Sequence, residues 1–175
     1  ADDATADRVA SLLGTVRIAH LACHGRFLPG SPHSSGLRLA DRWLTVRDIH
    51  ELHATPPIVI LSGCETGLHP KDGANELLGI AHGFAMGGSR AIVASLWSVN
   101  DEASTELMTT MHEWIARGET SVTTALRQAQ LALRGVHPHP AFWAAFFCTE
   151  SQVRDRSVSR GGASQGGAPY EELLM

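Results

Sequence analysis

Short, continuous apolar runs constrain the fold of this chain more than any other feature. They lie at residues 16–23, 58–62 and 91–97. Each run is almost entirely apolar and lacks the polar alternation of a half-exposed strand, which is typical of strands covered on both faces. Helices are expected around and between them at residues 7–13, 73–86, 101–117 and 121–134. Strands that alternate with helices predict an α/β fold with a mostly parallel sheet and right-handed crossovers.

The remaining segments give weaker signals. Residues 26–44 are rich in Gly, Pro and Ser and are expected to be a loop, in which residues 36–41 alternate like one arm of a hairpin. Thr45 is the expected cap of a short helix that reaches Leu52. An aromatic-rich final strand is expected at residues 142–148.

Composition sets the domain bounds and excludes several classes of protein. From Ser151 the chain is rich in Ser, Gly, Arg and Gln, so we expect one domain over residues 1–150 and a disordered tail over 151–175. The net charge of −4 argues against direct binding of nucleic acid. No apolar stretch approaches the roughly 20 residues of a membrane span, so no membrane association is expected. Three irregularly spaced cysteines form no disulfide framework, and the start of the chain lacks a signal-peptide pattern, which together favour a cytoplasmic protein.

Two of the apolar runs end on a reactive side chain near a glycine. Residues 18–25 read Ile-Ala-His-Leu-Ala-Cys-His-Gly, and residues 58–67 read Ile-Val-Ile-Leu-Ser-Gly-Cys-Glu-Thr-Gly. If the two strands lie side by side and parallel, His24 and Cys64 emerge at the same edge of the sheet, where ligands of such sheets gather. A histidine can take the proton of a thiol and later give it to a leaving amine. The pattern therefore predicts a cysteine–histidine nucleophile pair.

Residues next to this pair are candidates for contacts with a substrate. The backbone N–H groups of Gly25 and Cys64 are candidates for an oxyanion hole. The segment after the third apolar run should face the same cleft, so Trp97, Ser98 and Asp101 are candidate substrate-binding residues. In this interpretation the Asp101 carboxylate pairs with a basic side chain of the substrate. The alternative is that Asp101, or the residue before it, only caps the next helix.

Less specific interpretations are also open. A free cysteine is most often a small buried residue, and that is the role expected for Cys23 and Cys148. A metal site of His20, Cys23 and His24 is disfavoured, because strand alternation points the cysteine away from the histidines and no Cys-x-x-Cys appears. We therefore expect no metal and no cofactor, and His20 is expected to be a hydrogen-bonded core histidine. The glycines of residues 79–88 match neither the dinucleotide nor the P-loop pattern.

Taken together, the motifs resemble the CHAT domain, a caspase-like peptidase domain. The resemblance rests on His-Leu-Ala-Cys-His-Gly at 20–25, Ser-Gly-Leu-Arg-Leu-Ala-Asp at 35–41 and Val-Ile-Leu-Ser-Gly-Cys-Glu-Thr-Gly at 59–67. Further matches lie at residues 76–84, 88–101 and 139–143. The similarity runs from about Val16 to Phe147 in the family's order.

The resemblance implies a caspase-hemoglobinase-like three-layer sandwich and cysteine endopeptidase activity on protein or peptide substrates. His24 matches the family's catalytic histidine and Cys64 its nucleophile. The resemblance also implies a cytoplasmic, commonly bacterial setting, in which an activating partner or an attached sensor domain triggers cleavage. A full domain of this family begins with further strands before the histidine strand. One short helix precedes that strand here, so an open sheet edge is expected beside it.

We therefore predict a cysteine endopeptidase. A catalytically inactive, caspase-like interaction module is the first alternative, and a cysteine hydrolase acting on a small amide is the second. Labelling of Cys64 by a thiol-directed peptidyl probe argues against the first alternative, and cleavage of a broad peptide library counts against the second.

Overall fold

The computed structural model describes residues 4–26, 28, 30–52, 54–62, 73–97, 100–119, 121–151 and 172–174, of which 73–78 and 172–174 are described by their backbone only. The elements, in chain order, are α1 (Ala6–Leu13), β1 (Ile18–Leu21), β2 (Gly25–Arg26), the 3-10 turn η1 (Pro32–Ser34), β3 (Gly36–Arg38), β4 (Trp43–Thr45), α2 (Val46–His50), β5 (Ile58–Leu61), α3 (Gly73–Met86), β6 (Ala91–Ser95), α4 (Asp101–Ala116), α5 (Val122–Val136), α6 (Pro140–Trp143), β7 (Phe146–Glu150) and β8 (Glu172–Leu174).

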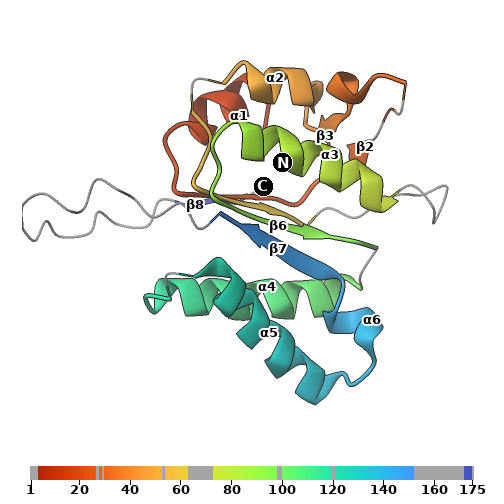
Figure 1. Ribbon diagram of the computed structural model, residues 1–175, viewed down its shortest axis with the longest axis vertical. Helices are drawn as coiled ribbons and strands as arrows, with labels where there is room; N and C mark the ends of the chain where they lie inside the picture. The colour runs from red at the N-terminus through yellow and green to blue at the C-terminus, as the bar shows by residue number, and fades with distance from the viewer. Residues whose placement is uncertain are drawn as a thin grey trace, which may run out of the picture.

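Five strands form one mostly parallel sheet in the order β7-β6-β5-β1-β8. β1 pairs in parallel with β5, and β5 pairs in parallel with β6, whereas β7 runs antiparallel to β6. Helices α1, α2 and α3 cover one face of this sheet, and α4 and α5 cover the other (Figure 1). The predicted α/β sandwich with helices on both faces is therefore confirmed. No helix in the described part of the chain is long and apolar enough to cross a membrane.

Alternation along the strands explains why both faces of the sheet are apolar. In β5, Val59 and Leu61 point into the core formed with α1, α2 and α3, whereas Ile60 points into the core formed with α4 and α5. All three side chains are fully buried. Each such burial contributes about 1.5–3 kcal/mol, so neither face of β5 tolerates polar residues, and the strand reads as a continuous apolar run.

A second, smaller sheet lies at the end of β1, where we predicted mainly a loop. Its strands pair antiparallel in the order β2-β3-β4. The predicted hairpin arm contains β3, but β2 and β4 are too short to leave a pattern. Gly36 is required here, because an added Cβ would lie 2.4 Å from the carbonyl oxygen of Leu44. Thr45 caps α2 as predicted: its hydroxyl accepts from the N–H of Asp48, and the Asp48 carboxylate accepts from the N–H of Thr45.

The structure of the C-terminal part differs from the sequence-based expectation in two places. The strand expected at 142–148 lies at Phe146–Glu150, because Pro140 and the capping side chain of His139 start the short helix α6 before it. Residues 172–174 were assigned to a disordered tail, but they form β8, which pairs in parallel with β1. β8 therefore covers the edge of β1 that we expected to be open, and it satisfies backbone groups of that edge.

Candidate active site

His24 lies just beyond the carboxyl end of β1, at the edge where the parallel strands end. β1 and β5 are neighbours in register, with Leu21 opposite Leu61. The N–H of Ser62 donates to the carbonyl of Leu21 at 3.3 Å, which extends the contact beyond the strands. The predicted parallel arrangement of the two motif strands is therefore confirmed. The His24 side chain is exposed, and its carbonyl accepts from the N–H of Arg38 at 2.7 Å, which ties this residue to β3.

The amide of Gly25 points away from the strand with which it pairs. The hydrogen bond between His24 and Arg38 makes the next pair, Gly25 and Leu37, a non-hydrogen-bonded pair of the antiparallel ladder. The N–H of Gly25 therefore points away from β3, toward the unpaired edge of β2, which is the edge strand of the small sheet. This orientation is compatible with the predicted role of Gly25 as an oxyanion donor.

Of the other predicted site residues, Cys64 and Ser98 lie outside the described residues, whereas Trp97 and Asp101 are described. Trp97 lies beyond the carboxyl end of β6, the end that β6 shares with β1 and β5, and its side chain is exposed. Its indole Nε1–H donates to the carbonyl of Ala141 in α6 at 3.4 Å. The contact ties Trp97 to the helix that precedes β7.

Asp101 is the exposed first residue of α4, but it is not the cap of this helix. The cap is Asn100, whose side-chain oxygen accepts from the N–H groups of Glu102 and Ala103. The capping alternative thus applies to Asn100. A substrate contact of the Asp101 carboxylate stays a prediction.

A buried polar cluster that we did not predict lies beneath this edge of the sheet. His20 of β1 stacks on His112 of α4, with ring centroids 5.4 Å apart, and its Nε2 shares a 2.6 Å hydrogen bond with the hydroxyl of Ser62. The Nδ1 of His20 is buried and has no hydrogen-bond partner among the described residues, so the expected core histidine is only half satisfied. Burial and, second, the charge of His112 lower the pKa of His20 from 6.5 to about 4. A neutral His20 therefore holds Ser62, which directly follows β5 and is two residues before Cys64.

The two described cysteines are packing residues, as predicted. Cys23 packs against the core on the α1–α3 side of the sheet, and Cys148 against the core on the α4–α5 side. Burial raises the pKa of the Cys23 thiol to about 11, and burial also raises the pKa of Cys148. Both thiols are therefore protonated at neutral pH, and a protonated thiol is a poor nucleophile.

The small sheet carries a basic and aromatic group that we also did not predict. The guanidinium carbon of Arg26 lies 4.2 Å from the ring centroid of Trp43, and that of Arg38 lies 5.9 Å from it. Strand alternation puts these three side chains on one face, which we call the outer face, because Leu37 of the intervening row points into the core. His24, opposite Arg38, belongs to the same face. The alternation at 36–41 was the one sequence signal for this arrangement.

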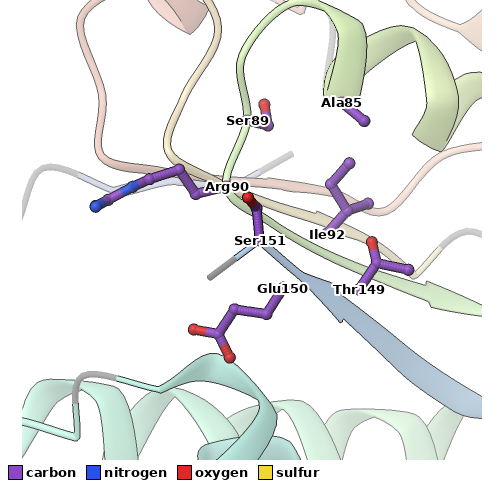
Figure 2. Close-up of a pocket in the computed structure, with 7 residues that line it drawn as sticks. All are labelled: Ala85, Ser89, Arg90, Ile92, Thr149, Glu150 and Ser151. Carbon is purple, nitrogen blue, oxygen red and sulfur yellow. The ribbon is translucent and has the colours of Figure 1, made fainter. Parts of the chain in front are cut away.

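A pocket of about 270 Å³ lies at the other end of the sheet (Figure 2). Its lining residues are Ala85, Ser89, Arg90, Ile92, Thr149, Glu150 and Ser151. The carboxylate of Glu150 points toward α5 in Figure 2, where it accepts from the Ser121 hydroxyl and the Thr123 N–H at 3.0 and 3.1 Å. Ser89 and Arg90 come directly before β6, whereas His24 comes after β1. The pocket therefore lies at the amino edge of the parallel strands and is not part of the candidate site.

A mostly parallel sheet between two helical layers, with a histidine at its carboxyl edge, is consistent with a caspase-like α/β sandwich. The chain belongs to the CHAT domain family, whose family model matches residues 1–151. This family is caspase-like and related to peptidases. A search of curated proteins found no match to the chain.

Proposed function

We propose that this chain is a cysteine endopeptidase in which Cys64 is the nucleophile and His24 is the general acid and base. The observation that carries this proposal is the parallel, in-register pairing of β1 with β5. His24 is three residues beyond Leu21, and Cys64 is three residues beyond Leu61, the two residues that face each other in this pairing. Both motifs therefore start from neighbouring positions at the ligand-binding edge of the sheet.

The proposed reaction follows from these roles. The Cys64 thiolate attacks a peptide carbonyl, and the N–H groups of Gly25 and Cys64 stabilise the resulting oxyanion. The imidazolium of His24 then protonates the leaving amine, which breaks the peptide bond and leaves a thioester on Cys64. Water, deprotonated by His24, attacks this thioester, releases the new carboxyl terminus and restores the thiol.

The electrostatics of the other cysteines support the assignment of Cys64. The chain has three cysteines, and two of them, Cys23 and Cys148, have thiols whose pKa is raised by burial. A nucleophilic role therefore falls to the third. Trp97, Ser98 and Asp101 are proposed as substrate contacts at the same edge. We further propose a cytoplasmic setting and control by an activating partner or an attached sensor domain, in line with the resemblance to caspase-like peptidases.

Cleavage of a broad peptide library, analysed by mass spectrometry, tests the proposal. The unmodified protein is expected to generate new peptide ends, and Cys64→Ala is expected to lose them by at least about a thousandfold. Cys148→Ala is the matched control and should keep the cleavage pattern, because this thiol is a packing residue. Equal cleavage by Cys64→Ala would refute the assignment. An intact library with every variant would favour the inactive interaction module.

A further inference from the structure

We propose that the outer face of the small sheet binds an acidic side chain of the substrate, with Arg26 and Arg38 as the residues that select it. This inference rests on the proposed peptidase function and names its substrate class. The substrates are protein segments that carry Asp or Glu close to the bond that is cut.

Arg26 and Arg38 both lie close to His24. Arg38 is the last residue of β3, and its N–H donates to the carbonyl of His24, the residue just before β2. Arg26 is two residues beyond His24 and shares its face of the sheet. Side chains two residues apart on one face of a strand are about 7 Å apart, which is the length of two extended residues of a bound peptide. A peptide that reaches His24 and runs along β2 therefore passes within reach of both guanidinium groups.

The positive charges of Arg26 and Arg38 favour an acidic ligand. In the described part of the chain, no carboxylate lies within ion-pair distance of Arg26 or Arg38. The acidic residues near them in sequence are engaged elsewhere: Asp41 accepts from the first N–H of α1 at 2.8 Å, and Asp48 is held by the cap of α2 and by Arg42. Among the described residues, no counter-charge accompanies these two positive charges beside His24, in a chain of net charge −4. A carboxylate is the group that complements them.

Arg26 is held in a way that leaves it ready to bind a carboxylate. Its guanidinium is stacked over the ring of Trp43 at 4.2 Å, and its Nε is buried without a hydrogen-bond partner among the described residues. Stacking fixes the plane of a guanidinium but uses none of its N–H donors, so the terminal nitrogens stay available for a carboxylate. Gly36, which faces Arg26 in the ladder, has no side chain that would cover them. The group is therefore preorganised for an acidic ligand.

Binding to a peptide array tests this inference without requiring cleavage. The full chain carrying Cys64→Ala is applied to peptides that occur in pairs, one with Asp or Glu and one with Asn or Gln at the same position. We expect the acidic member to bind about three- to tenfold more tightly at low salt, with a smaller ratio at high salt. Adding Arg26→Gln or Arg38→Gln should bring the ratio close to one. Adding Arg134→Gln, an exposed arginine of α5, should leave it unchanged.

The outcomes separate this inference from the proposed peptidase function. A ratio near one in the Cys64→Ala protein, or a high ratio that survives both Arg26→Gln and Arg38→Gln, overturns the inference. If Arg26→Gln does not fold, Arg38→Gln decides, because its side chain is exposed and its removal leaves the core intact. A preference for acidic peptides together with no labelling of Cys64 by a peptidyl electrophile supports the binding face and counts against the peptidase. Cleavage without any preference for acidic peptides supports the peptidase and refutes the acidic binding face.

Discussion

Because His20 is buried, we predict that the unfolding free energy falls in mildly acidic solution. In the unfolded chain its pKa has the ordinary value of 6.5, whereas burial and the neighbouring His112 lower the pKa in the folded protein to about 4. The unfolded state therefore binds the proton more readily, so this contribution to stability is complete above pH 6.5. It is lost as the pH falls from 6.5 toward 4. Linkage between these two pKa values gives a loss of about 2 kcal/mol in unfolding free energy from pH 7 to pH 5.

Urea unfolding at pH 5 and pH 7 measures this loss. With a urea dependence of about 2 kcal/mol per molar, the midpoint should fall by about 1 M. His20→Gln removes the titration and keeps a polar group for Ser62, so the variant should lose most of the pH dependence. His82→Gln, at an exposed position of α3, is the control and should behave like the unmodified protein. If His20→Gln keeps the full pH dependence, the titrating group lies elsewhere and the reasoning fails.

Three further predictions concern the framework of the site. Gly36→Ala should lower the unfolding free energy by about 1–3 kcal/mol, because its Cβ would meet the backbone oxygen of Leu44, whereas Gly30→Ala, with open space around it, should have little effect in the same urea assay. Removal of residues 172–175 should expose the edge of β1; a fall in melting temperature and concentration-dependent association in light scattering are expected, and unchanged values would contradict the pairing of β8. Iodoacetamide at pH 7.5 should leave Cys23 unmodified in the folded protein, because burial raises its pKa to about 11; rapid modification read by mass spectrometry would argue against that burial.

The fold could be predicted because it depends on local patterns. Residues 58–61 are apolar on both faces, and such a run fits a buried strand of a parallel sheet. The cap formed by Thr45 and Asp48 is a local four-residue pattern, and its first residue, Thr45, was predicted from the sequence. β8 was missed because its partner, β1, lies at the opposite end of the chain, and because three residues are too few to show the pattern of a strand.

The candidate site could be predicted only where one short motif carries it. His24 and Cys64 are proposed because each follows an apolar run and stands near glycine. The stack of Arg26 on Trp43 depends on the fold of the small sheet, which brings distant segments together. The contact between His20 and a histidine of α4 joins elements far apart in the sequence and likewise leaves no local signal, although a polar residue inside an apolar run was a hint.

The central claim, a competent pair of Cys64 and His24, is tested most directly by active-site labelling. The folded protein is treated with peptidyl electrophiles that carry acidic, neutral or basic side chains, and the modified residue is identified by mass spectrometry. We predict modification at Cys64 that falls by at least about a hundredfold in His24→Ala, while Cys23 and Cys148 stay unmodified. Labelling of Cys64 at the same rate in His24→Ala, or no labelling by any of the probes, would contradict it.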